Sequence, residues 1–141
     1  IHNKGLLLHV DVGSYYPSLL LAWELVTRAA TNDNYRRVYD TRMSLKAAGK
    51  KKEQAPYKKL LNALSGAMKD ITNPAYDPRN NNCMCINGQL MLLDLIEHLE
   101  VVPGLELIQS NTDGLIIWIP ETTSSPRLIL HFSVLHLHSQ S

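Results

Sequence analysis

Cysteine, phenylalanine and tryptophan are scarce in this chain. It has two cysteines, one phenylalanine and two tryptophans, while its charged residues, 19% of the sequence, are ordinary for a globular protein. Two cysteines exclude a disulfide-stapled scaffold, and a bridge between Cys83 and Cys85, one residue apart, would be strained. Zinc would need two more ligands at a suitable spacing. We therefore interpret both cysteines as reduced thiols in a reducing compartment.

Long apolar runs and a signal peptide are also missing. No apolar run reaches the roughly eighteen residues that a membrane-spanning helix needs. The chain begins at Ile1, no signal-peptide pattern follows, and its 141 residues suffice for one domain rather than two. We expect a protein that is neither secreted nor bound to a membrane and that begins inside a longer reading frame.

The net charge of +1 conceals an uneven distribution. Residues 31–60 hold nine basic and three acidic residues, whereas residues 61–141 hold three basic and eight acidic ones. A basic block beside an acidic remainder fits a protein that grips a polyanion in one place and holds cations in another. A solvated helix face explains the same pattern, and charge alone favours that interpretation.

The apolar pattern predicts a mixed α/β chain. Strands are expected at residues 5–11, 105–110 and 115–119, the last two forming a hairpin around the turn 111–114. Helices are expected at residues 18–29, 35–48, 53–68 and 86–99. Residues 71–82, with two prolines and four asparagines, are expected to be a loop or an extended crossing segment.

Single residues set the details of these expected helices. Pro17 suits a helix start, and residues 31–34 offer N-cap candidates for the second helix. Gly49 and the lysines at 50–52 predict a turn, and Pro56 is expected only in the first turn of a helix. One side of the last helix is expected to carry Leu90, Leu93, Ile96 and Leu99.

The pattern degrades after Pro120. The tail contains His131, His136 and His138 without an accompanying carboxylate, which does not favour a metal site. We expect residues 121–141 to lie outside the native core.

Two aspartates stand where a charge is expensive. Asp11 ends an apolar strand, and Asp113 lies in the turn of the expected hairpin. Two convergent carboxylates suit magnesium, which prefers oxygen ligands and keeps water and substrate phosphates in its shell. Taken alone, however, two aspartates this far apart in a chain are usually a helix cap and a turn residue.

Four residue strings resemble the motifs of family B DNA polymerases. Asp11 to Ser18 (DVGSYYPS) resembles D-x-x-S-L-Y-P-S, with Tyr15 replacing Leu, and Lys58 to Gly66 (KKLLNALSG) resembles K-x-x-x-N-S-x-Y-G. Asn111 to Gly114 (NTDG) resembles D-T-D-S, and Arg42 to Lys46 resembles the R-x-x-x-K of the fingers helix. The strings keep the family's order, and the similarity covers residues 5–120. It looks closest to the phage and viral members.

The resemblance implies an α+β fold, with a palm of helices packed on a small antiparallel sheet and a helical fingers hairpin. Residues 1–30 and 69–120 would form the palm, residues 31–68 the fingers, and residues 121–141 a tail. The family's exonuclease and thumb domains have no counterpart here, which suggests a truncated or frameshifted copy. A cytoplasmic location in a phage-infected or prophage-bearing cell is expected.

The resemblance also implies ligands and roles. Asp11, Asp113 and the carbonyl of Val12 would hold two Mg²⁺ ions, and the partners would be dNTPs and primer-template DNA. The nucleotide would be bound by Ser14, Tyr15, Tyr16, Arg42, Lys46, Lys58 and Asn62. In this set the amides at 14 and 15 would meet the triphosphate, Tyr16 would exclude a 2′-hydroxyl, and Arg42 with Lys46 would clamp the β- and γ-phosphates. Lys59, Gly66 and Thr112 would contact DNA.

Departures from the motifs leave other functions open. Asn111 replaces the first Asp of the third motif, and Ala63 and Ser65 replace Ser and Tyr in the second. The expected function is template-directed DNA synthesis, and the alternative is a catalytically inactive remnant that binds nucleic acid weakly. A magnesium-dependent nuclease using Asp11 and Asp113 is a third interpretation, but it gives Lys58, Asn62 and Arg42 no role.

Overall fold

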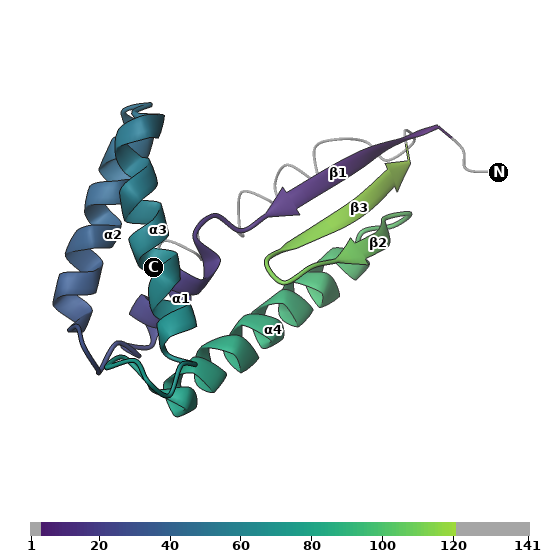
Figure 1. The fold of residues 1–141 in the computed structure, drawn as a ribbon. Helices are drawn as coiled ribbons and strands as arrows, with labels where there is room; N and C mark the ends of the chain where they lie inside the picture. The colour runs from purple at the N-terminus through teal and green to yellow at the C-terminus, as the bar shows by residue number, and fades with distance from the viewer. Residues whose placement is uncertain (1–3, 121–141) are drawn as a thin grey trace. The chain divides into compact units, whose positions relative to one another are not determined.

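The computed structural model describes residues 4–120, which form three strands and four helices (Figure 1). The expected α+β class is confirmed. The described residues divide into two compact units: residues 4–12 with 92–120, called here the sheet unit, and residues 13–91, called here the helical unit. Within residues 4–120, no helix has both the length and the apolar character needed to cross a membrane. The expectations for the tail, 121–141, lie outside the described residues.

The sheet unit is built on three antiparallel strands. They are β1 (Gly5–Asp11), β2 (Glu106–Ser110) and β3 (Gly114–Pro120), in the order β1-β3-β2 (Figure 1). The predicted strand and hairpin are therefore confirmed, with bounds that differ by at most one residue. The pairing of β2 with β3 shifts register between Leu107 and Gln109, and β3 pairs with β1 along its whole length.

Alternation along β3 creates the core of the sheet unit. Leu115, Ile117 and Ile119 point to one face and are at most 6% exposed, and they pack with Leu99 near the end of the last helix. Leu8, Val10, Leu95, Ile96 and Leu105 surround this cluster. Burying each of the four buried side chains contributes roughly 1.5–3 kcal/mol, so one apolar face holds the sheet against the helix.

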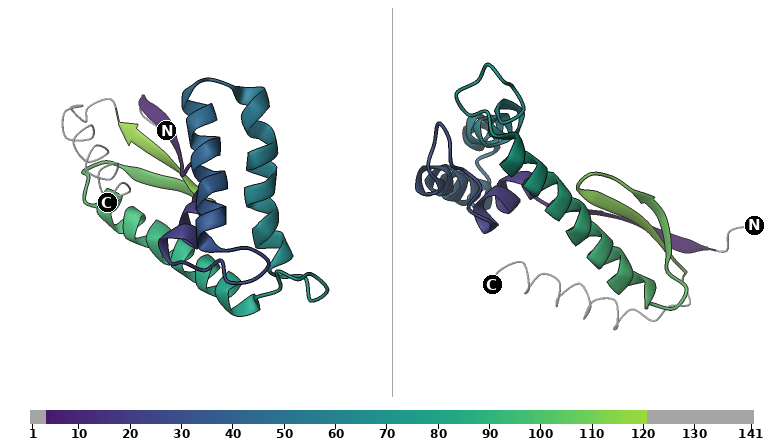
Figure 2. Two further views of the ribbon diagram at one scale, coloured as in Figure 1. Left: turned by 90° about the vertical axis from the view of Figure 1, so that its left-hand side faces the viewer. Right: turned by 90° about the horizontal axis from the view of Figure 1, so that it is seen from below.

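The helical unit contains a hairpin of two antiparallel helices, α2 (Asn32–Ala47) and α3 (Lys51–Ala67) (Figures 1 and 2). Thr31 caps α2 by accepting a hydrogen bond from the Asn34 amide at 3.2 Å. Gly49, at φ 73°, ends α2 in a Schellman motif, with the Lys50 amide donating to the Leu45 carbonyl at 3.0 Å. The expected glycine turn is confirmed.

The expected bounds of α3 are wrong at its start. Because the Schellman motif closes the turn within two residues, α3 begins at Lys51 and takes in two of the lysines expected in the turn. Pro56 consequently lies in the second turn of the helix and not in the first. It lacks the amide hydrogen that would bond the Lys52 carbonyl, and the helix continues through it.

Helix α1 (Tyr15–Ala22) starts earlier and ends sooner than predicted. The expectation of helix up to residue 29 is wrong because Glu24 and Ala29 take left-handed conformations, at φ 51° and 61°. The side chain of Asn32 satisfies backbone groups of this segment, accepting from the Val26 amide and donating to the Glu24 carbonyl, both at 3.1 Å. These side-chain bonds replace the helical ones.

The last helix, α4 (Pro78–Glu100), is longer than predicted, and the second half of the expected loop 71–82 is helical. Asp77 caps it, its Oδ1 accepting from the Asn80 amide at 3.2 Å, and Pro78 suits the first helical position. The expected apolar side is wrong in part. Leu90 and Leu93 are more than half exposed, whereas Met84, Leu92 and Leu99 are buried.

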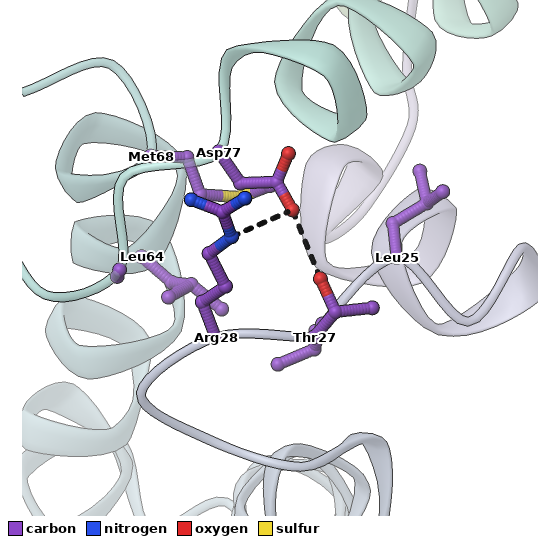
Figure 3. Close-up of a pocket in the computed structure, with 8 residues that line it drawn as sticks. Leu25, Thr27, Arg28, Leu64, Met68 and Asp77 are labelled. Carbon is purple, nitrogen blue, oxygen red and sulfur yellow. Dashed lines mark hydrogen bonds and ion pairs between the residues drawn. The ribbon is translucent and has the colours of Figure 1, made fainter.

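Asp77 also joins two segments of the helical unit beside a shallow hollow (Figure 3). Its Oδ2 accepts hydrogen bonds from Thr27 Oγ1 and Asn80 Nδ2, both at 2.9 Å, and lies 3.9 Å from Arg28 Nε. Arg28 also donates to the Tyr76 carbonyl at 2.7 Å. The polar groups around the hollow therefore satisfy one another's hydrogen-bonding capacity. We interpret their role as structural, since they link residues 27–28 to residues 76–80.

Candidate active site

The sheet unit brings the two predicted carboxylates to one end of the β1–β3 pair. Asp11, the last residue of β1, is in register with Gly114, the first residue of β3 and the neighbour of Asp113. The Val12 amide donates to the Asp113 carbonyl at 2.8 Å, and the Asn111 amide donates to the Gly114 carbonyl at 2.8 Å. Residues about a hundred positions apart in the chain are thus fixed side by side by backbone bonds.

Gly114 allows this close approach. A Cβ at this position would lie 2.7 Å from the Val10 carbonyl oxygen and 3.3 Å from Asp11 Oδ1. The first distance is shorter than real Cβ contacts, so any other residue would push the two strands apart. Sequence reasoning treated Gly114 only as part of a turn, and its role depends on a strand that lies far away in the sequence.

The donor set at this strand end fits magnesium. Asp11 and Asp113 are both exposed, and the Asp11 carboxylate lies alongside Gly114, next to Asp113. Carboxylate and carbonyl oxygens are hard ligands, and magnesium is commonly bound through one or two carboxylates plus substrate phosphates. Within residues 4–120 no group of three or more His, Cys, Asp or Glu side chains gathers into a metal site. Asn111, where the motif has Asp, accepts a hydrogen bond from Gln109 Nε2 at 2.8 Å.

The helical unit brings together Ser14, Arg42 and Lys46. Ser14 precedes α1 in a left-handed conformation, and Arg42 of α2 donates from Nη1 to its Oγ. Lys46 lies one turn further along α2, and its Nζ is 3.6 Å from the position of a Cβ on Gly13. Both cations therefore face the turn at residues 13–14, as the i, i+4 spacing predicts.

Arg42 has one more partner, which sequence reasoning missed. Its Nε donates to the Oε1 of Gln54 on α3 at 3.2 Å. Arg42 is only 6% exposed, so its guanidinium is a buried charge whose hydrogen-bond partners are both neutral. No sequence signal marked Gln54, because the contact joins two helices across the hairpin.

The tyrosines of the first motif differ in their surroundings. Tyr15 is buried, and its hydroxyl donates to the Gly88 carbonyl of α4. Gly88 makes room for this ring, since a Cβ there would lie 3.3 Å from Tyr15 Cε1 and 3.0 Å from Leu19 Cδ1. Tyr16 is half-buried, with its ring stacked on that of Tyr15 at a centroid distance of 6.1 Å. Tyr15 is therefore a packing residue as well as a motif position.

The remaining predicted residues are exposed and are not drawn together by described contacts. Lys58, Lys59, Asn62 and Gly66 lie along α3, and Thr112 lies in the β2–β3 turn. Lys58 and Asn62 are one helical turn apart, so they share a face of α3. Ser65 occupies the position where the motif has Tyr. Its Oγ donates a hydrogen bond to the Asn62 carbonyl at 2.9 Å.

The fold of this chain is similar to part of a solved DNA polymerase. The structure of the family B DNA polymerase from the hyperthermophilic archaeon Pyrobaculum calidifontis matches it with a TM-score of 0.64 and 17% sequence identity. The match covers 93% of this chain and 22% of the archaeal chain, so this chain spans only a small part of that polymerase. No protein-family model and no curated protein sequence matches it. The likeness establishes a polymerase-like fold, and the phage-like relationship stays a prediction.

Proposed function

We propose that this chain is the nucleotidyl-transfer core of a template-directed DNA polymerase, which joins dNTPs to a primer 3′-hydroxyl. The observation that carries the proposal is the β1–β3 register, which puts Asp11 beside Gly114 and Asp113. The fold similarity to a family B DNA polymerase supports it, as do the cations that face the turn at residues 13–14.

In this proposal Asp11 and Asp113, with the Val12 carbonyl, would hold two magnesium ions. Bound there, such ions would lower the pKa of an attacking hydroxyl and neutralise charge on a departing pyrophosphate. The carboxylates suit this role because they are exposed at the end of a rigid strand pair. Backbone hydrogen bonds fix that pair, so little reorganisation is needed when substrate arrives.

The cations of the helical unit are proposed to bind the triphosphate. Arg42 and Lys46 reach the turn at residues 13–14, and the amides at Ser14 and Tyr15 lie where α1 begins, a place that favours anions. Lys58 and Asn62 share an exposed face of α3 and are proposed to contact the phosphates and the base or sugar. Tyr16 is proposed to lie under the sugar and to exclude a 2′-hydroxyl.

Primer-template DNA is the proposed macromolecular partner. Lys59, Gly66 and Thr112 are exposed, as contacts to a DNA backbone require. The basic surplus of residues 31–60 supplies the attraction to phosphate, and this contribution weakens as salt rises. Selection of the incoming nucleotide would rest on base-pair geometry, without base-specific contacts from the protein.

Primer extension with magnesium and four dNTPs tests the proposal. The parent chain is expected to extend the primer, and Asp113→Asn is expected to lose about a hundredfold or more of that activity. Glu97→Gln, which neutralises an exposed carboxylate on α4, is the matched control and is expected to keep parental activity. Circular dichroism establishes that all three chains are folded. Equal extension by Asp113→Asn would contradict the assignment of the carboxylates.

A catalytically silent module that binds nucleic acid is the second candidate. It is favoured by Asn111, which replaces a carboxylate and bonds to Gln109, and by Ser65, which replaces an aromatic ring. Binding of primer-template by the folded parent without extension would favour this candidate. DNA degradation that requires magnesium but no nucleotide would instead identify a nuclease.

A further inference from the structure

Among residues 4–120, the buried arginine of the helical unit has no acidic partner. Arg42 is 6% exposed, and the ion pairs found among residues 4–120 do not include it. Glu53, the sequence neighbour of Gln54, pairs with Lys50 Nζ at 3.2 Å. A buried guanidinium normally gains a carboxylate partner, because leaving the charge uncompensated is costly. The place beside Arg42 is filled by an amide instead.

The guanidinium keeps free donor capacity. Nη1 donates to Ser14 Oγ and Nε donates to Gln54 Oε1, and in the described part of the chain Nη2 has no hydrogen-bond partner. Among residues 4–120, the one side-chain nitrogen or oxygen that is both fully buried and without a hydrogen-bond partner is Asn81 Oδ1. Nη2 of Arg42 has no partner within that range and is not that atom, so it must keep some contact with solvent. Arg42 is therefore oriented by two neutral groups while part of it stays accessible.

We propose that Gln54 is a positioning residue for the triphosphate site: its neutral amide oxygen aims Arg42 without cancelling the charge of Arg42. This inference rests on the proposed function, in which Arg42 and Lys46 bind the phosphates of a dNTP. A carboxylate at residue 54 would hold Arg42 in place more firmly but would compete with the phosphate for it. An amide holds Arg42 in the same geometry and leaves the positive charge of Arg42 free to bind the phosphate.

The proposal separates orientation from charge, and two substitutions separate them experimentally. Gln54→Glu keeps an acceptor of the same length and adds a negative charge, whereas Gln54→Ala removes the acceptor. Gln89→Glu is the matched control, because it adds the same charge at an exposed position of α4. The probe is inorganic tripolyphosphate, titrated calorimetrically in the presence of EDTA, with thermal unfolding measured on the same samples.

Stability and affinity are expected to move in opposite directions in Gln54→Glu. Its Kd for tripolyphosphate is expected to rise about tenfold or more, since Arg42 gains a charged partner, while its Tm equals or exceeds that of the parent. Gln54→Ala is expected to weaken binding about threefold and to lower Tm, and Gln89→Glu to stay within about twofold of the parent.

Three results would overturn the inference: no measurable binding by the parent, a Kd for Gln54→Glu within twofold of the parental value, or a loss of affinity in Gln54→Glu that comes with a loss of Tm in that same variant. The last would mark Gln54 as a scaffold residue only. Tripolyphosphate without metal does not involve Asp11 or Asp113. Failure of primer extension and failure of this inference are therefore distinguishable.

Discussion

The sheet unit and the helical unit hold their candidate functional side chains in opposite ways. In the sheet unit, Asp11 and Asp113 are exposed, and backbone pairing of β1 with β3 sets their positions. In the helical unit, Arg42 is buried, and side-chain hydrogen bonds to Ser14 and Gln54 set its position. Neutralising a carboxylate of the sheet unit should therefore affect chemistry alone, whereas changing Arg42 affects chemistry and packing together.

The largest effects on stability are expected in the two cores. Ile117 of the sheet unit and Leu61 of the helical unit are both 0% exposed. Ile117→Ala and Leu61→Ala are each expected to lower the free energy of unfolding by about 2–5 kcal/mol, through lost burial and the cavity left behind. Urea denaturation followed by fluorescence measures this, since Trp118 lies in the sheet unit and Trp23 in the helical unit. A loss below about 1 kcal/mol would contradict the core assignment at that site.

A smaller effect on stability is expected at the end of the β1–β3 pair, where Gly114 lies beside the carboxylate of Asp11. In Gly114→Ala, the new Cβ would meet the Val10 carbonyl at 2.7 Å, so the backbone of one strand must move. We expect a loss of about 1–3 kcal/mol in unfolding free energy and weaker magnesium-dependent extension. Gly66→Ala is the control for stability only and is expected to lose none, because nothing beyond its own helix backbone and chain neighbours lies within 4 Å of a Cβ at that position. Equal stability of Gly114→Ala and the parent would show that β1 and β3 tolerate separation.

The smallest effect is expected at the link between α2 and α3. The buried Tyr35 hydroxyl donates to the Leu61 carbonyl at 2.8 Å, and Tyr35→Phe should cost about 1 kcal/mol at neutral pH. Burial raises the pKa of this hydroxyl, against an opposing effect of Arg42. The folded state therefore keeps Tyr35 neutral above about pH 10, where the unfolded chain ionises, and stability falls as pH rises further.

This pH dependence distinguishes Tyr35 from an ordinary tyrosine. The parent should lose up to about 1.4 kcal/mol per pH unit from Tyr35 above pH 10, and Tyr35→Phe should lack that contribution. Urea denaturation at pH 7 and at successive alkaline values measures it, with the half-buried Tyr57 changed to Phe as control. Parallel alkaline profiles of the parent and Tyr35→Phe would count against burial as the cause.

Much of the fold could be predicted from local patterns. A short apolar run predicted β1, two apolar runs around a tight turn predicted the β2–β3 hairpin, each within one residue, and Gly49 predicted the turn between α2 and α3. The early start of α4 was missed although its signal is local: Asp77 followed by Pro78 is an N-cap followed by a favourable first helical residue. The asparagines at 80–82 obscure this start, because asparagine is a weak helix former.

The early end of α1 was beyond sequence reasoning. Residues 18–29 are apolar enough for a helix, and the left-handed turn at Glu24 is supported by Asn32, eight residues away. The exposure of Leu90 and Leu93 could not be predicted from the sequence either. Helical periodicity indicates which residues share a face of the helix, but not which face is buried. A periodic pattern predicts that a helix forms. The residues that contact the helix in the folded protein determine where it ends and which side is buried.

Local patterns in the sequence were enough to nominate the groups that are proposed to carry chemistry: two aspartates at strand ends, a cation pair one helical turn apart, and the order of four motif-like strings. Which of these groups meet depends on the fold. It set Asp11 beside Asp113 through a register that needs Gly114, and it gave Arg42 the neutral partner Gln54 from another helix. Residue type and local spacing are encoded within a few positions of the chain. Contacts between distant segments depend on packing, which no local pattern contains.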